Sequence, residues 1–205
     1  MNPQYYHDVI TEKSWRILQD WQRQHRFILI GGWAVYLFTH ALKSKDIDIA
    51  VSLEELGKLK EEYAVAKNER LKKYEARRDE IDIDIYVEYY SNPGLPVEAL
   101  RGHTVTREGF SVPEIEYLLL LKENAWMARR GSDKGEKDAI DLIALLQAGA
   151  DLRKYRDVLL QHAAMHLLDP LRALVEDTRD VSQLGLNQHA FSRLKKEWLS
   201  HIVKE

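Results

Sequence analysis

Cysteine is absent from the 205 residues of this sequence. Its absence excludes disulfide bonds, zinc sites built on thiolates and a thiol nucleophile. Long apolar runs are also missing: the longest candidate, Tyr117–Leu121, is flanked by charges and falls far short of the ~20 residues of a membrane span. The N-terminus lacks a basic start followed by an apolar core, so we expect no secretory signal. We therefore expect a cytoplasmic protein with no membrane partner.

An excess of charge of either sign is missing too. The chain has 30 basic and 33 acidic residues, which gives a formal net charge of −3. A dedicated nucleic-acid binder is usually more basic, so strong nonspecific binding is not expected, although local basic patches could contact a phosphate backbone. The composition, 45% hydrophobic and 31% charged, is typical of a folded chain that forms one large or two small domains.

Hydrophobic periodicity predicts an α+β fold in the N-terminal half. Trp15, Leu18 and Trp21 have helical spacing, and alternating apolar residues indicate strands. The expected order is a helix within 11–25, a strand at 26–30, a turn at the glycines, a short helix at 33–42, a strand at 46–51, a helix from Ser52, and strands at 71–76 and 81–87 joined by a tight turn at 77–80. This order predicts a small mixed sheet flanked by helices.

The C-terminal half is expected to be all-helical. Residues 101–110 show no regular pattern and are interpreted as irregular. The predicted helices are 112–130, 134–148, 151–168, 170–180 and 187–203. Ser111 and Glu114 have capping-box spacing with Pro113 in the first turn, Gly149 is a helix stop and Asn187 an N-cap. We predict domains at 1–110 and 111–205.

Four aspartates in two predicted strands are the most informative feature of the sequence. Asp46 and Asp48 alternate with isoleucines, as do Asp82 and Asp84, so each pair shares one face of its strand. If the strands are neighbours, carboxylates crowd one patch, which is costly unless a cation compensates. Oxygen ligands of this kind suit Mg²⁺ or Mn²⁺. The alternative is a solvated sheet face, but aspartate is depleted in strands, which favours a site.

Two glycines follow the first predicted strand. Gly31 and Gly32 would let backbone N–H groups approach a phosphate, and the following helix N-terminus favours negative charge. An ordinary tight turn is the alternative interpretation. His25, His40 and His103 show no ligand spacing and are interpreted as surface or packing residues.

The segment 29–49, LIGGWAVYLFTHALKSKDIDI, resembles the signature of the DNA polymerase beta–like nucleotidyltransferase superfamily. That signature is an apolar residue and then Gly-Gly or Gly-Ser, followed, after a spacer, by alternating Asp and apolar residues. Within the superfamily the chain is most similar to small prokaryotic AbiEii-like proteins, which include toxins of toxin–antitoxin systems. The resemblance covers residues 28–90 well and the helical half loosely. It implies a catalytic domain at 1–110 and a helical domain at 111–205 that completes the cleft.

The resemblance implies roles for individual residues. The metal ligands, binding Mg²⁺ or Mn²⁺, would be Asp46, Asp48 and Asp84, with Asp82 as the alternative third carboxylate; Asp84 would also help to deprotonate the acceptor hydroxyl. The nucleotide-binding residues would be Gly31, Gly32, Ser44, Lys45, Lys122 and Arg129. Leu42 stands where the family often has an arginine, so Lys43 or Lys45 would take over its contacts.

In the helical half, Lys122 and Arg129 lie on one helix face and could neutralise a triphosphate. The alternative for Lys122 is an ammonium that extends to water. Asp138 and Asp141 share a face as well, and an ordinary Lys137–Asp141 ion pair is the alternative to a role in the site.

The resemblance thus implies an enzyme that transfers NMP from an NTP to an acceptor hydroxyl of RNA, such as tRNA, or of protein, with a cognate partner protein if it acts in a toxin–antitoxin system. The alternative is a catalytically weak component of a two-protein regulatory system that binds nucleotide or partner.

Overall fold

The computed structural model describes residues 3–179 and 181–202. The chain divides into two compact units, Met1–Glu114 and Ile115–Glu205, and each unit is described by itself. Of the helices in the described residues, none combines the length with the apolar character that crossing a membrane requires.

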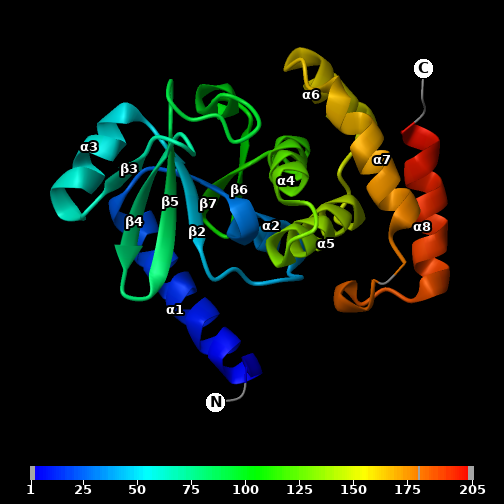
Figure 1. The fold of residues 1–205 in the computed structure, drawn as a ribbon, viewed down its shortest axis with the longest axis horizontal. Coiled ribbons are helices and arrows are strands. Elements are labelled where there is room, and N and C mark those ends of the chain that lie inside the picture. The colour runs from blue at the N-terminus through cyan, green and yellow to red at the C-terminus, as the bar shows by residue number, and fades with distance from the viewer. Residues whose placement is uncertain (1–2, 180, 203–205) are drawn as a thin grey trace. The chain divides into compact units, whose positions relative to one another are not determined.

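The first unit contains a five-stranded sheet, a two-stranded hairpin and the helices that pack against them (Figure 1). Its elements are α1 (Pro3–Gln24), β1 (Ile28–Ile30), α2 (Gly31–Thr39), β2 (Ile47–Val51), α3 (Leu53–Glu62), β3 (Ala66–Asn68), β4 (Lys73–Arg78), β5 (Ile81–Val87), the 3-10 helix η1 (Val97–Leu100), β6 (Thr104–Arg107) and β7 (Phe110–Pro113).

The large sheet is mixed, with the strand order β1-β2-β5-β4-β3. Only the central pair, β2 and β5, is parallel; the other neighbours are antiparallel. Parallel neighbours need a crossover connection, and the chain from β2 to β5 supplies it through α3, β3 and β4. Figure 1 shows α3 beside β3 and β4. As a result, the two aspartate-bearing strands run side by side in the same direction.

Alternation along β2 and β5 separates a buried face from a polar face. Ile47, Ile49, Ile83 and Ile85 are fully buried, whereas the aspartates between them are not. Each buried isoleucine contributes about 1.5–3 kcal/mol of transfer free energy, which sets the register firmly because a one-residue slip would expose all of them.

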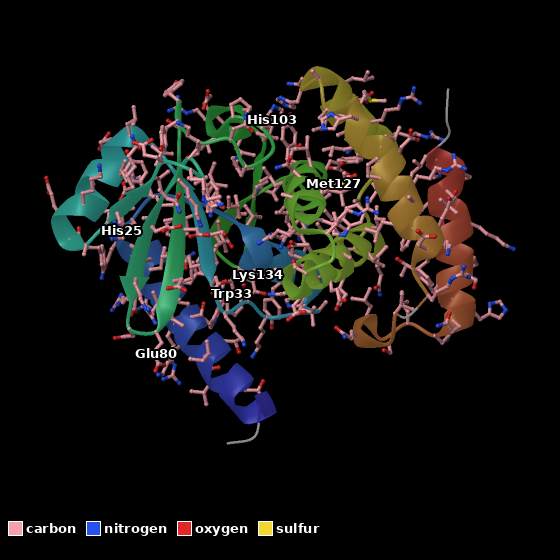
Figure 2. The ribbon with its side chains drawn as sticks, viewed as in Figure 1. His25, Trp33, Glu80, His103, Met127 and Lys134 are labelled. Atoms are coloured by element: carbon pink, nitrogen blue, oxygen red, sulfur yellow. The ribbon has the colours of Figure 1, made fainter. Side chains whose placement is uncertain are left out.

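Helix α2 is anchored to α1 by its tryptophan. The indole nitrogen of Trp33, labelled in Figure 2, donates a hydrogen bond to the hydroxyl of Ser14 at 2.8 Å. The Trp33 ring also lies 4.9 Å from the ring of Trp15, between centroids. These contacts hold the start of α2 in a fixed place after β1. The helix begins at Gly31 itself, so the glycines form its first turn rather than a separate turn before it.

Three local features of the first unit differ from the sequence predictions. Strand β3 was not expected, and residues 104–113 form the β6–β7 hairpin instead of an irregular segment. The hairpin turns at Glu108 and Gly109, whose φ angles of 47° and 84° are those of a two-residue turn. The capping box predicted at Ser111 is wrong, because Ser111 and Pro113 lie in β7 and the helix begins at Ile115.

The second unit is helical throughout its described residues, 115–179 and 181–202. Its elements are α4 (Ile115–Arg129), α5 (Asp133–Gln147), α6 (Leu152–Gln161), η2 (Met165–Leu167), α7 (Leu168–Asp177), η3 (Ser182–Leu184) and α8 (Gln188–His201). The α+β class with a helical second half is therefore confirmed.

Helix ends in this unit agree with most of the signals in the sequence. Gly149 follows α5 with a φ of 101°, and the Asn187 side chain accepts a hydrogen bond from the Ala190 amide at the start of α8. The single helix predicted at 151–168 is wrong: α6 ends at Gln161, and Ala163 has a φ of 52°, which breaks the helix.

Candidate functional site

Three carboxylates lie in one row across the large sheet. Asp48 on β2 is in register with Asp84 on β5, and Asp84 is in register with Glu75 on β4. Residues directly opposite each other on neighbouring strands share a face, so the three side chains point to the same side of the sheet. Like charges opposite one another repel, and this row therefore requires compensation from cations.

The two remaining aspartates of the pattern flank this row. Asp46 lies just before β2 and is partly exposed. Its negative charge contributes to raising the pKa of Asp84. Asp82 is in register with Arg77, whose Nε lies 3.7 Å from Oδ1 of Asp82. The side chain of Asp82 is 68% exposed. Of the two candidates on β5, Asp84 is the one that lies directly beside Asp48.

Asp84 is a partly buried carboxylate with a raised pKa. Only 26% of its side chain is exposed, and the ammonium of Lys73 lies 2.6 Å from Oδ2. Burial raises the pKa of Asp84, Lys73 opposes that rise, and the neighbouring charges of Glu75 and Asp46 add to it; the net pKa is raised. A carboxylate whose pKa is raised in this way binds a proton more readily than an exposed aspartate does.

Lys73 links two carboxylates of the row. Its Nζ is 3.1 Å from Oε1 of Glu75 as well as 2.6 Å from Asp84, and its side chain is 10% exposed. Burial lowers the pKa of Lys73, but the pairs with Asp84 and Glu75 outweigh burial and the net pKa is raised. A hydrogen bond from Asn68 and then one from Lys73 lower the pKa of Glu75. Lys73 is therefore a positively charged side chain among these carboxylates.

Gly31 brings the first turn of α2 against Asp48. A Cβ at Gly31 would lie 2.1 Å from Oδ2 of Asp48, and the φ of Gly31 is 67°. Both facts require glycine at this position. Ile30, the N-cap, has no side-chain acceptor, and the backbone N–H groups of the turn that includes the buried Gly32 form a helix N-terminus suited to anions.

The predicted contacts just before β2 fall on an irregular segment. Ser44 is buried, whereas Lys43 and Lys45 are exposed. These positions adjoin Asp46 along the chain and precede the strand that carries Asp48. Their predicted role in nucleotide binding stays a prediction.

The predicted residues of the second unit form an ion network between α4 and α5. Lys122 Nζ lies 3.1 Å from Asp138 Oδ1 and 2.7 Å from Asp141 Oδ2, and all three side chains are buried. Arg129 Nη2 lies 2.7 Å from Asp138 Oδ2. The ammonium of Lys122 therefore does not extend to water. Asp138 and Asp141 pair with α4, and the predicted contact of Lys122 and Arg129 with nucleotide stays a prediction.

The sheet carboxylates match Mg²⁺ or Mn²⁺ in donor type, since every donor is oxygen, and Asp48 and Asp84 are in register. In the residues that the structure describes, however, no group of three or more His, Asp or Glu is already arranged to hold a metal ion. The ammonium of Lys73 lies 2.6 Å from Oδ2 of Asp84. The residues fit the ion in chemistry and register, and Asp84 would have to exchange its lysine partner to bind it.

Sequence reasoning missed Lys73 and Glu75. The turn at Asp79 and Glu80 pairs Arg78 with Ile81, and counting back from that pair places Glu75 opposite Asp84. The sequence located this turn only to within four residues, and a shift of one residue would have sent Lys73 and Glu75 to the other face.

Comparisons with known proteins give distant likenesses only. No family model matches the sequence, and no curated protein matches it. Solved structures do match.

The Megavirus polyadenylate synthase is 16% identical with a TM-score of 0.47 and covers 72% of this chain; the chain spans 32% of that protein. JHP933 from Helicobacter pylori is 15% identical with a TM-score of 0.44, over 98% of this chain and 94% of that one. A further H. pylori protein, provisionally named a nucleotidyltransferase, is 17% identical with a TM-score of 0.45, over the whole of both chains. Likenesses of this size do not assign the chain to a family.

Proposed function

We propose that this chain is a Mg²⁺-dependent nucleotidyltransferase that moves NMP from an NTP to an acceptor hydroxyl. The observation that supports the proposal most is the pairing of Asp48 with Asp84 on adjacent parallel strands, with Gly31 packed against Asp48. Carboxylates beside a helix N-terminus supply the two elements that a metal–triphosphate complex needs: oxygen ligands for the ion and N–H donors for phosphate.

In this proposal Asp46, Asp48 and Asp84 would hold the ion, which would supply positive charge to the reacting phosphates. The N–H groups around Gly31 and Gly32 bind the triphosphate and orient its α-phosphorus. Asp84, whose pKa is raised, accepts the proton of the attacking hydroxyl. The new oxygen–phosphorus bond forms as the bond to pyrophosphate breaks. Positioning supplies most of what the protein contributes to such a transfer.

The acceptor is proposed to be a hydroxyl of RNA, such as tRNA, or of protein. The resemblance of residues 28–90 to AbiEii-like proteins supports this choice, and it supports a place in a toxin–antitoxin system with a cognate partner protein.

The test is to supply each labelled NTP with Mg²⁺, total RNA and cell protein, and to measure incorporation. We expect labelling by the native protein and a loss of more than about 100-fold in Asp48→Ala and Asp84→Asn, because each removes a proposed ion ligand. Asp82→Asn is the matched control on the same strand, and we expect it to retain most of the activity. Labelling that is equal in native protein and Asp48→Ala would contradict the proposal.

A second candidate function is nucleotide or partner binding without transfer. The ion pair between Lys73 and Asp84 favours this second function, because a site in which Lys73 stays bound to Asp84 would not bind a divalent ion. This alternative predicts that NTP or a partner protein binds, as measured by calorimetry, without Mg²⁺ and equally well in Asp48→Ala. The first proposal predicts that NTP binding depends on both.

A further inference from the structure

Lys73 occupies a chemically unusual place in the first unit. It lies on β4, two residues from Glu75 and on the same face, and its ammonium reaches across to Asp84 on β5. The aliphatic part of the side chain is packed, with the residue 8% exposed. The ammonium therefore sits among the sheet carboxylates and is no mobile surface charge.

Lys73 acts as an internal counter-ion for two carboxylates of the sheet. Glu75 and Asp84 are directly opposite each other on antiparallel strands, and the repulsion between their charges is relieved by Lys73, which contacts both. A divalent cation at Asp84 would relieve the same repulsion through the same oxygen, Oδ2. Two cations cannot occupy one oxygen at close range without repelling each other.

We propose that Lys73 competes with the divalent ion for Asp84, and that ion binding takes place in exchange for the lysine. This inference rests on the proposed function, because it assumes that Asp84 is an ion ligand. Glu75 makes the exchange feasible: it is a second acceptor for the ammonium, 3.1 Å away, and it stays with Lys73 on β4 when Asp84 turns to the ion. Lys73 thus acts through Asp84 and lowers the affinity of the site for the ion.

Competition and simple orientation by Lys73 predict opposite effects on ion affinity when Lys73 is removed. If Lys73 only oriented Asp84, its removal would weaken ion binding. If it competes, its removal tightens ion binding in the absence of nucleotide, because the ion no longer has to displace an ammonium. Removing a partly buried ion pair such as the one between Lys73 and Asp84 should change the affinity for the divalent ion by about three- to tenfold.

The experiment is a titration of the full chain with Mn²⁺, followed by electron paramagnetic resonance of the free ion, with no nucleotide present. We expect Lys73→Met, which keeps the apolar stem, to bind Mn²⁺ about three- to tenfold more tightly than the native protein. Lys73→Arg keeps the charge and should bind as the native protein does. The matched control is Lys67→Met on β3, whose ammonium pairs with Glu69 at 2.6 Å and does not contact the row.

Two further variants separate this inference from the proposed function. Asp84→Asn should abolish Mn²⁺ binding at this site in both the native and the Lys73→Met background. If Asp84→Asn has no effect, the ion site and the inference both fail. If binding depends on Asp84 but Lys73→Met leaves affinity unchanged or weaker, the inference alone is overturned. Thermal unfolding with and without Mn²⁺ confirms that each variant is folded, and the tighter variant should show the larger stabilisation.

Discussion

At the scale of single residues, the start of α2 is constrained in two ways. Gly31 combines a positive φ with a carboxylate at the place where a Cβ would be. The positive φ would strain the backbone of any other residue, and the Asp48 carboxylate leaves no space for a side chain. A glycine pair in the sequence indicated a close approach of the backbone; the structure shows that the group approached within this chain is Asp48.

We expect Gly31→Ala to destabilise the protein by at least about 2 kcal/mol, because the new Cβ meets Asp48 and the left-handed backbone becomes strained. Gly57→Ala is the matched control: Gly57 lies inside α3 with no atom within 4 Å of the added Cβ. There the change should be neutral or stabilising by up to about 1 kcal/mol. Urea denaturation of both variants measures the difference. Equal stabilities for the two would show that Gly31 is not constrained as described.

At the scale of elements, a buried glutamate joins three helices of the second unit. Glu123 on α4 is fully buried, accepts a hydrogen bond from the Tyr155 hydroxyl on α6 and one from the Leu171 backbone on α7. Burial raises the pKa of Glu123 from 4.5 to about 8, although both hydrogen bonds oppose the rise. The neutral acid is therefore the form that the folded unit favours at neutral pH.

This shift makes stability depend on pH. Between pH 4.5 and about 8 the folded chain retains a proton that the unfolded chain releases. The contribution of Glu123 to stability is thus fully present below pH 4.5 and is lost as pH rises to about 8, with a slope of at most about 1.4 kcal/mol per pH unit. Glu123→Gln is neutral at every pH and should lack this loss.

Urea denaturation of both proteins at pH 5, 6.5 and 8 isolates the contribution, since all other groups titrate alike in the two proteins. We expect the native protein to lose on the order of 2 kcal/mol more than Glu123→Gln between pH 5 and 8. Parallel pH profiles would mean that Glu123 titrates normally.

The elements also show what the sequence could and could not predict. Alternation at Ile47–Ile49 and Ile81–Ile85 was sufficient to predict both aspartate strands and their faces. The β6–β7 hairpin was missed because its only strong cue is the turn at Gly109, between short strands with few apolar residues. The pairing of Asp48 with Asp84 is a matter of register between strands far apart in the chain, which periodicity within a strand does not determine.

At the scale of the whole molecule, the chain consists of two compact units. The sheet carboxylates and α2 belong to the first unit, whereas Lys122 and Arg129 belong to the second. The proposed function assigns the ion to the first unit, and the resemblance assigns nucleotide contacts to both. Ligand-induced protection from hydrogen exchange, followed unit by unit, distinguishes these assignments.

We expect Mg²⁺ with NTP to slow amide exchange in β1, the first turn of α2, β2 and β5, because a ligand that binds only the folded state suppresses opening of its site. Mass spectrometry of peptides covering 28–33, 47–51 and 81–87 measures the effect. Slowed exchange in 115–129 as well would support the predicted contact of Lys122 and Arg129 with nucleotide. Asp84→Asn is the control and should show no protection in either unit; protection that persists in it would place the ligand elsewhere.

The parallel pairing of β2 with β5 has a consequence for the timing of synthesis. Asp48 emerges from the ribosome well before Asp84, and the helix and strands of the crossover must be made between them. A nascent polypeptide that stalls anywhere before residue 84 holds only half of the acidic pair. The proposed ion site therefore cannot form until residue 84 has been synthesised, and products terminated before that residue would be inert.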